Sequence, residues 1–447
     1  MKFTFSWLKR HLDTQATPDQ IAQRLTMLGL EVEDLHDPAA RLQGFIVGQI
    51  MEAAGHPNAD RLRLCKVATG QGMLEVVCGA PNARAGLKVA LATPGVIIPS
   101  TGEALKAGSV RGVLSQGMMC SSRELLLGED HDGIIELPAD AAVGAPLASV
   151  LHLDPLFDIA ITPNRADCLG VRGVARDLAA AGLGRLKPLQ IDPVKGSFKS
   201  PVGVHLDFPP EAQAACPLFV GRTIRGVRNG ESPQWLKDWL SGIGLRPISA
   251  LVDITNYITI DLARPLHVFD CRQVQGDIRA RLARSGEMLK ALNGKEYPLD
   301  ETMTVIADDA RALALAGVMG GEDSGVTADT TDVFLEVALF DPLRTAATGR
   351  KLAVESDARY RFERGVDPAF VLPAAELATR MIIEICGGEV STLVQAGTPP
   401  ESRPAIAFHP ARVAKIGGFE IDRDEMRQIL EGLGCAPTLG GEVWTVI

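Results

Sequence analysis

Polar side chains interrupt an apolar stretch at residues 251–270. Thr255 and Asn256 stand among aliphatic and β-branched residues, and His267 lies between two aliphatic neighbours. A buried hydroxyl or amide costs about 1–3 kcal/mol unless it is hydrogen-bonded. Such side chains therefore indicate either a satisfied internal network or a ligand pocket, and both interpretations stay open at this point.

Two further segments would have to position these groups. The run 251–260 is rich in β-branched residues, and we predict that it is a buried strand. Glu336 interrupts a second apolar run, and strand alternation alone turns its side chain to solvent. Gly317-Val318-Met319-Gly320-Gly321 follows an apolar strand and would let the backbone approach a ligand closely, although the spacing is not that of a phosphate loop.

Composition indicates an ordinary globular protein of about three domains in 447 residues. The first residues do not read as a signal peptide, and no run of about 18 apolar residues predicts a membrane span. The eight cysteines are scattered and the histidines never adopt ligand spacing, so we expect a reducing cytoplasm and no metal site.

Charge is distributed unevenly along the chain. The net charge is −10, yet residues 41–123 hold nine Lys and Arg against four Asp and Glu, a local excess of five positive charges. Short β-rich runs separated by Gly, Pro and Asn turns in the same region predict a small barrel or sandwich. A locally basic module inside an acidic protein is compatible with a phosphate backbone as partner.

The remaining segments alternate between helix and strand. Thr17, Pro18 and Gly29 are typical of a helix N-cap, first position and C-terminal end. The turn at 162–167 holds Arg165 and Asp167, which we interpret as a pair that holds the following helix, with a ligand-binding turn as the alternative. The helical face that ends at Gly434 starts a last unit, and we expect the terminal strand-like run 443–447 to lack a partner strand.

The order of these pieces resembles the bacterial phenylalanyl-tRNA synthetase β subunit. The resemblance covers the whole chain and rests on several separate motifs. These are Met1-Lys2-Phe3-Thr4-Phe5-Ser6-Trp7, His56-Pro57-Asn58-Ala59-Asp60-Arg61-Leu62, Ser115-Gln116-Gly117-Met118, Thr162-Pro163-Asn164-Arg165-Ala166-Asp167, Asp253-Ile254-Thr255-Asn256-Tyr257, Arg264-Pro265-Leu266-His267, Leu315-Ala316-Gly317 and Arg361-Phe362-Glu363-Arg364-Gly365-Val366-Asp367.

The resemblance implies an α+β multidomain chain. A small α+β module is interrupted by an OB-fold β-barrel of the tRNA-binding type and is followed by a mixed α/β editing domain and part of a further small α+β module. The expected ranges are 1–40 and 151–200 for the first module with its linker, 41–150 for the barrel, 201–398 for the editing domain and 399–447 for the last module.

The resemblance also implies partners and a reaction. In that family the β subunit pairs with a catalytic α subunit as (αβ)2, binds phenylalanine tRNA, tRNA(Phe), and hydrolyses tyrosine wrongly attached to it. The family continues well beyond residue 447 with the modules that hold the Mg²⁺ ligands, so we expect no cofactor in this chain and no aminoacylation by it alone.

Site residues follow from the same resemblance. Glu336 matches the position that reads the tyrosine hydroxyl, while His267, Thr255 and Asn256 match catalytic or positioning residues of the pocket. Its walls correspond to Ala316 and Gly317 on one side and to Ser356 and Ala358 on the other. For the tRNA contact we select three basic residues of the 41–150 module, Arg61, Arg63 and Lys66.

Two functions from different classes remain open. The first is hydrolytic editing, and the second is a non-catalytic tRNA-binding and assembly scaffold whose pocket is vestigial. A third, weaker option is a free-standing nucleic-acid-binding protein, because the basic module lacks the clustered aromatic residues that stack bases. Glu336, Thr255, Asn256 and His267 must share one cavity if editing is correct.

Overall fold

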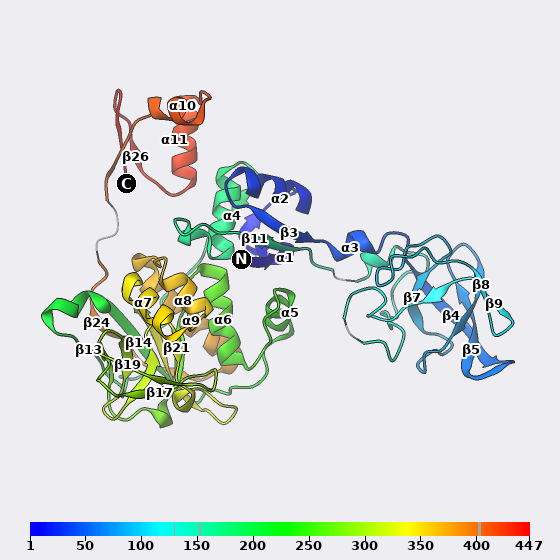
Figure 1. The fold of residues 1–447 in the computed structure, drawn as a ribbon, viewed down its shortest axis with the longest axis horizontal. Helices are drawn as coiled ribbons and strands as arrows, with labels where there is room; N and C mark the ends of the chain where they lie inside the picture. The colour runs from blue at the N-terminus through cyan, green and yellow to red at the C-terminus, as the bar shows by residue number, and fades with distance from the viewer. Residues whose placement is uncertain (129, 152, 401–403) are drawn as a thin grey trace. The chain divides into compact units, whose positions relative to one another are not determined.

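The computed structural model describes residues 1–128, 130–151, 153–400 and 404–447. It divides into two compact units, residues 35–156 and residues 1–34 with 157–447 (Figure 1). Residues 401–403, at the predicted start of the last module, lie outside the described residues.

Segments from both sides of residues 35–156 build one small α+β module. Its three-stranded sheet has the order β1-β11-β3, so the returning strand lies between the two earlier ones. Thr17 caps α2 in a capping box, as predicted, and Gly29 follows that helix with a φ of +80°. The elements are β1 (Lys2–Thr4), α1 (Phe5–His11), β2 (Leu12–Asp13), α2 (Pro18–Met27), β3 (Val32–His36), β11 (Leu156–Ile159), α4 (Val171–Ala180) and β12 (Arg185–Leu186).

Residues 35–156 are dominated by β structure. One five-stranded sheet has the order β10-β7-β4-β5-β6, and a backbone hydrogen bond of 2.8 Å from Gln116 to Glu75 brings the segment before β10 to the outer edge of β6. The sheet thus curves back on itself, but no strand ladder closes it into a barrel among the described residues. The elements are α3 (Pro38–Arg41), β4 (Ile46–His56), β5 (Ala59–Ala68), β6 (Met73–Cys78), β7 (Lys88–Ala92), β8 (Gly108–Val110), β9 (Val113–Ser115) and β10 (Met118–Met119).

Two five-stranded sheets form residues 201–398. The first has the order β13-β16-β19-β20-β21, and the second has the order β15-β22-β14-β23 with β24 also paired to β14. Phenylalanine and aliphatic side chains of both sheets share one buried core. The strands are β13 (Val204–Asp207), β14 (Leu218–Arg225), β15 (His267–Asp270), β16 (Ile278–Leu282), β19 (Thr304–Ala307), β20 (Ala312–Leu315), β21 (Met319–Gly320), β22 (Asp332–Leu339), β23 (Glu389–Val390) and β24 (Val394–Gly397), with a side hairpin of β17 (Met288–Lys290) and β18 (Glu296–Pro298).

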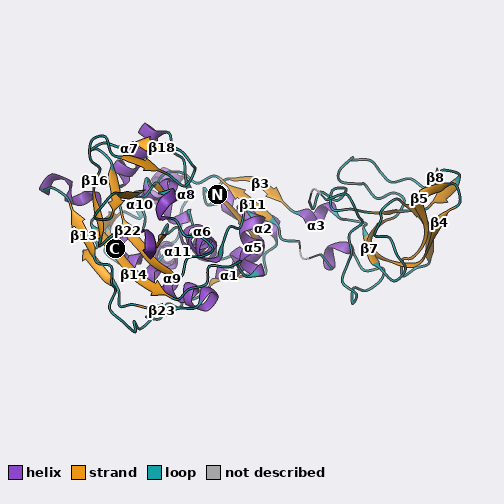
Figure 2. Cartoon of the chain, turned by 90° about the horizontal axis from the view of Figure 1, so that it is seen from below, coloured by secondary structure: helices purple, strands orange, loops and turns teal. Residues whose placement is uncertain are grey.

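Helices accompany the second of these sheets (Figure 2). Helix α9 contacts β22 and β14 as well as α6, and α6 in turn contacts β15. The mixed character predicted for this domain is therefore confirmed. The helices are α5 (Gln234–Gly242), α6 (Ala250–Leu262), α7 (Pro342–Leu352), α8 (Asp357–Phe362) and α9 (Val371–Cys386).

The predicted strand over 251–260 is wrong, because this run is helix α6. Nine of its thirteen residues are buried, so the helix shows little apolar periodicity and resembles a buried strand in sequence. Its acidic side chains are satisfied locally. Asp253 accepts hydrogen bonds from Ser232 Oγ at 2.5 Å and from the Ile248 backbone at 2.9 Å. Asp261 accepts from the Trp7 indole at 2.7 Å and from the Tyr257 hydroxyl at 3.0 Å.

The last described segment is a small α+β module. Its sheet has the order β25-β27-β26, so the terminal strand lies in the centre and pairs with both neighbours. The expectation of an unpaired final strand is therefore wrong. The elements are β25 (Ile406–Phe408), α10 (Ala411–Gly417), α11 (Arg423–Gly432), β26 (Pro437–Thr438) and β27 (Trp444–Val446).

Candidate functional site

His267 and Glu336 lie directly opposite each other on neighbouring strands. His267 opens β15, and its Cα partner in the antiparallel register with β22 is Glu336. Opposed residues in such a pair place their Cβ atoms about 4.5–5.5 Å apart. We call His267 and Glu336 the cross-strand pair.

The cross-strand pair borders a small cavity of about 70 Å³. Nine of the other lining residues come from the β20–β21 hairpin and from helix α8, and most of the lining is apolar. The lining consists of Pro265, Leu266, His267, Ile306, Ala314, Leu315, Ala316, Gly317, Val318, Met319, Gly320, Glu336, Phe340, Ala358 and Phe362. The structure thus brings together His267, Glu336, Ala316, Gly317 and Ala358, five of the predicted site residues.

Burial favours the neutral form of both Glu336 and His267. Glu336 is 6% exposed, and burial raises its pKa to about 8, against a weaker opposing effect of the Arg264 charge. Burial also lowers the pKa of His267 to about 4. The solvent-facing orientation that alternation predicted for Glu336 is therefore wrong, since both faces of β22 are covered.

One nitrogen of the imidazole is left without a partner. His267 Nε2 is out of contact with solvent and has no hydrogen-bond partner among the described residues. The ring packs edge-to-face on Phe269 with a centroid distance of 4.6 Å, which restricts its orientation. A buried, unpaired and oriented nitrogen beside a neutral carboxyl is an arrangement that a ligand would satisfy.

Glycine backbone forms the opposite wall. A Cβ at Gly320 would lie 2.6 Å from His267 Cε1, so this position must be a glycine for the ring to keep its place. Gly317 has a φ of +68°, in the left-handed region that disfavours side chains. The close approach of backbone predicted for the 317–321 segment is present, and its neighbour is the imidazole.

A buried arginine stands close to the pair. Arg264 is 1% exposed, its Nη2 donates to the Ala338 carbonyl on β22, and its guanidinium lies 5.7 Å from the centre of the Phe362 ring. Burial lowers its pKa to about 10, and the nearby Glu336 opposes that shift. Sequence reasoning assigned Arg264 no role in the site, although its place three residues before His267 was a usable signal.

Three predicted site residues do not line the cavity. Thr255 and Asn256 belong to α6, and the Thr255 hydroxyl donates to the Val252 carbonyl of its own helix at 2.7 Å. Ser356 caps α8 and donates to the carbonyl of Val318 at 2.6 Å, so it supports the wall from behind. The condition that Glu336, Thr255, Asn256 and His267 all share one cavity is therefore not met. His267 and Glu336 line the cavity, whereas Thr255 and Asn256 do not.

The three basic residues selected for tRNA contact lie on β5 and are exposed. Strand alternation places Arg61 and Arg63 on one face and Lys66 on the other. Lys66 also forms an ion pair of 2.8 Å with Glu52. Arg61 and Arg63 thus remain the better candidates for a phosphate contact within this unit.

A second polar group, at the start of α4, is fully paired. Arg165 and Arg176 each contact both Asp167 and Asp177, and we call these four residues the ionic cluster. Burial would raise the pKa of Asp167, but hydrogen bonds from the two arginines lower it to about 2. The predicted pair of Arg165 and Asp167 at the helix start is confirmed, with bonds of 3.1 and 2.9 Å.

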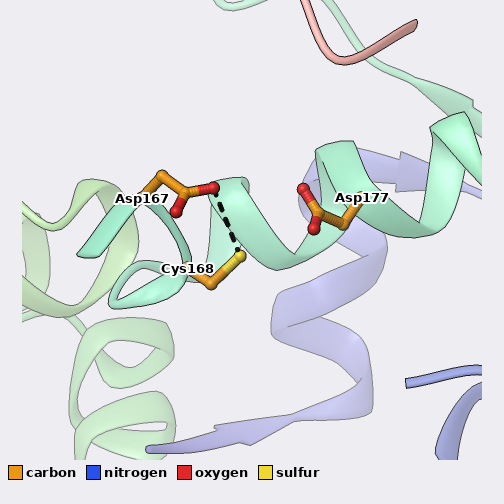
Figure 3. A group of neighbouring side chains, drawn as sticks. All are labelled: Asp167, Cys168 and Asp177. Carbon is orange, nitrogen blue, oxygen red and sulfur yellow. Dashed lines mark hydrogen bonds between the residues drawn. The ribbon is translucent and has the colours of Figure 1, made fainter. Parts of the chain in front are cut away.

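One group of side chains in the part of the chain that the structure describes could hold a metal ion, and it overlaps the ionic cluster. Asp167 and Cys168 from the 3₁₀ turn 166–168 and Asp177 from α4 lie close enough to share an ion (Figure 3). Their carboxylates are already neutralised by two guanidinium groups, and burial raises the pKa of the Cys168 thiol. These residues do not fit a metal, because a cation would have to displace both arginines.

Two family matches define the class of this protein. Residues 45–146 match the family described as "Putative tRNA binding domain", and residues 215–387 match the family described as "B3/4 domain". The cavity lies within the second match. The chain thus combines a domain of the tRNA-binding family with a B3/4 domain, in the order that the sequence predicted.

The relatives identify the family. A phenylalanine–tRNA ligase beta subunit from Paramagnetospirillum magneticum is 65% identical over 98% of this chain, and one from Rhodospirillum rubrum is 62% identical over 97%. The chain spans about half the length of the curated relatives it matches, 55% and 54% for these two. It is a close homologue of phenylalanine–tRNA ligase beta subunits, which confirms the predicted resemblance.

One solved structure aligns with part of this chain. An N-terminal fragment of the phenylalanyl-tRNA synthetase beta subunit from Pyrococcus horikoshii aligns with 66% of this chain and 81% of its own, with a TM-score of 0.32 and 18% identity. That likeness is too loose to bear on the site. Among the described residues, no helix is both long enough and apolar enough to span a bilayer.

Proposed function

We propose that this chain supplies the hydrolytic editing function of a phenylalanine–tRNA ligase beta subunit and removes tyrosine from mischarged tRNA(Phe). The observation that carries the proposal is the cross-strand pair, enclosed in an apolar cavity of the B3/4 domain with His267 Nε2 unpaired. The relatives support it by naming the ligase whose product would need such correction.

The chemistry of selection follows from the cavity lining. A hydrophobic synthetic site rejects an analogue that adds a hydroxyl by only about 10²-fold, whereas a site built to bond that hydroxyl discriminates by roughly 10⁴–10⁵. Glu336 offers a carboxyl oxygen that can accept a hydrogen bond from the tyrosine hydroxyl, and apolar neighbours such as Phe340 surround it. Phenylalanine in the same place would leave the buried carboxyl unpaired, which is the source of the selectivity.

In this cavity, His267 is the side chain best suited to act as a base. Its lowered pKa keeps the imidazole neutral at physiological pH, so one ring nitrogen holds a lone pair. In the proposal this nitrogen orients a water whose oxygen attacks the ester carbonyl carbon. The bond between that carbon and the ribose oxygen breaks, the ribose oxygen takes the proton that the water gives up, and the amino acid leaves with a free carboxyl group. Thr255 and Asn256 are given no part in this step, because they do not line the cavity. The proposal therefore rests on the cross-strand pair alone and not on the four-residue cavity expected from the sequence.

The cavity volume sets a condition on the proposal. Ligand pockets usually measure about 300–1,000 Å³, and the present cavity of about 70 Å³ is smaller. The proposal therefore requires its walls to separate when the aminoacyl end enters. The β20–β21 hairpin supplies much of the wall, and β21 is a two-residue edge strand whose separation breaks few hydrogen bonds.

Partners and setting belong to the same proposal. Pairing with an α subunit as (αβ)2, contact of the 35–156 unit with tRNA, and a cytoplasmic location suited to eight free cysteines all follow from the family. In this proposal, any Mg²⁺ that the whole enzyme requires is bound by parts of the longer relatives that lie outside this chain.

The decisive experiment is deacylation of tyrosine-charged tRNA(Phe), with phenylalanine-charged tRNA(Phe) as the control substrate. We expect selective hydrolysis of the tyrosyl ester by this chain and a loss of roughly 10²-fold or more in Glu336→Ala. Glu336→Gln keeps the shape and a carbonyl acceptor, so it tests whether the ionisable carboxyl group itself is needed. Equal hydrolysis of the two esters, or no hydrolysis by the folded chain, contradicts the proposal and favours a binding and assembly scaffold.

A further inference from the structure

Three segments meet at a second cleft, separate from the candidate editing cavity. Residues from the 162–167 turn, from the end of α6 and from the 361–367 segment line one cleft of about 520 Å³. That volume lies within the usual range of ligand sites, about 300–1,000 Å³. The lining consists of Ala166, Asp167, Arg172, Gly173, Arg176, Leu186, Leu189, Leu262, Ala263, Arg264, Arg364, Gly365, Val366, Asp367 and Phe370. We call it the arginine cleft.

Unpaired donors concentrate around the arginine cleft. Arg264 Nε, Arg264 Nη1 and Arg364 Nε are buried and have no hydrogen-bond partner among the described residues. They are three of the seven such side-chain atoms in the part of the chain that the structure describes. A buried unpaired donor costs about 1–3 kcal/mol, and more when it is charged, so a cluster of them requires an explanation.

The cleft carries an excess of positive charge. Four arginines line it against two aspartates. Arg176 already pairs with Asp167 in the ionic cluster, and Arg364 Nη1 pairs with Glu363 at 2.7 Å, which leaves Arg364 Nε unpaired. Arg172 donates to the Lys187 carbonyl at 3.0 Å and has no carboxylate partner among the described residues. Burial lowers its pKa, and the charge of Asp261 opposes that shift.

The rest of the surface is apolar. Leucine side chains from the β12 region and the end of α6 face the cleft together with Phe370 and Val366. A free inorganic ion would leave this apolar surface unused, and a neutral apolar molecule would leave the donors unpaired. The two halves of the lining match one ligand that carries an apolar body and an anionic end.

We propose that the arginine cleft binds a small amphipathic anion, an aromatic or aliphatic group that ends in a carboxylate or phosphate. Arg364 and Arg172 bind its charge through charge-assisted hydrogen bonds. The leucines and Phe370 cover its apolar body. Arg264 connects this cleft with the cross-strand pair, because it lines the cleft while bonding Ala338, two residues beyond Glu336.

Calorimetric titration of the full chain tests the proposal. The probes are phenyl phosphate and 3-phenylpropionate, which distinguish a phosphate from a carboxylate ligand. Inorganic phosphate has only the anionic group and benzyl alcohol has only the apolar group, and we call these two controls the half-probes. We expect saturable binding of at least one amphipathic anion. We also expect each half-probe to bind about tenfold more weakly or worse.

Variants locate the binding. Arg364→Met and Arg172→Met each keep an unbranched apolar chain, and Arg350→Met on α7 is the matched control at an exposed arginine outside the cleft. We expect about a tenfold loss of affinity in either cleft variant whose tryptophan emission is native, and unchanged affinity in the control. Absence of saturable binding at millimolar probe, or equal affinity in both cleft variants and the parent, overturns the proposal.

Discussion

The ionic cluster and the cross-strand pair are both polar groups in a largely apolar setting, but they differ in pairing. In the cluster two arginines meet two aspartates, and the lowered pKa of Asp167 reflects those bonds. In the pair the raised pKa of Glu336 and the lowered pKa of His267 arise from burial, and the imidazole Nε2 lacks a partner among the described residues.

The difference indicates what each group is for. A paired network satisfies its own charges and holds the start of α4 in place, so its contribution is to stability. An unpaired group reduces stability, and its retention indicates a ligand or a reaction. This comparison can be tested, because removal of a residue should have opposite effects in the two regions.

The largest expected effect is that of Asp177→Ala in the ionic cluster. Asp177 is 5% exposed and bonds both arginines, so its loss leaves two guanidinium groups with one carboxylate. We expect the free energy of unfolding to fall by about 3–5 kcal/mol. Denaturant unfolding followed by tryptophan emission measures it, since all four tryptophans lie in the unit formed by residues 1–34 and 157–447. Asp424→Ala, at a side chain 79% exposed, is the control and should change by less than about 1 kcal/mol.

The second effect has the opposite sign and depends on pH. Glu336 has a pKa of about 8 when folded and 4.5 as a free side chain, so the folded protein retains a proton that the unfolded chain loses. The contribution of Glu336 to stability is therefore fully present below pH 4.5 and is lost as pH rises towards 8, at about 1.4 kcal/mol per pKa unit. Glu336→Gln should match the parent near pH 4.5 and exceed it by a few kcal/mol at pH 8. Parallel stability curves of parent and variant would show that Glu336 already has a charge partner.

The same contrast explains what the sequence could and could not predict. Caps, turns and periodic helices such as α2 follow from local rules, and Thr17, Pro18 and Gly29 hold their predicted places. Strands β14, β16, β19 and β22 follow from short apolar runs bounded by turns. The multidomain α+β class and the family resemblance followed from the order of the motifs.

Helix α6 shows where local rules fail. Its β-branched residues favour a strand, but tertiary contacts bury it on several sides and its length of thirteen residues exceeds that of most strands. Tertiary contacts also determine which polar residues are bonded internally and which line a cavity. Sequence left open whether Thr255, Asn256 and His267 form a satisfied network or a pocket. The structure separates two of them, because the Thr255 hydroxyl bonds the Val252 carbonyl of its own helix, whereas His267 lines the cavity with Nε2 unpaired among the described residues.

A third prediction disturbs the cross-strand pair without touching its residues. In Gly320→Ala the new Cβ would lie 2.6 Å from His267 Cε1, so the imidazole must turn away. We expect a loss of about 1–3 kcal/mol in stability and a loss of about tenfold or more in tyrosyl-tRNA(Phe) hydrolysis. Gly230→Ala is the matched control, because its added Cβ has no atom within 4 Å among the described residues. Unchanged hydrolysis in a folded Gly320→Ala chain would remove His267 from the proposed step.

The smallest expected effect separates the two aspartates of the ionic cluster. The Asp167 side chain is 38% exposed, against 5% for Asp177. Water therefore screens the charge of Asp167, and it can solvate the two arginines once that carboxylate is removed. We expect Asp167→Asn to cost about 1 kcal/mol near neutral pH. Because the pKa of Asp167 is lowered from 3.8 to about 2, its contribution is present above pH 3.8 and is lost as pH falls through 2. The difference between parent and variant should therefore shrink in that acidic range and stay constant from pH 5 to 8. A stability advantage of the parent that instead fell as pH rose above 5 would mean that Asp167 is protonated in the native cluster. The pairing that distinguishes this cluster from the cross-strand pair would then be absent.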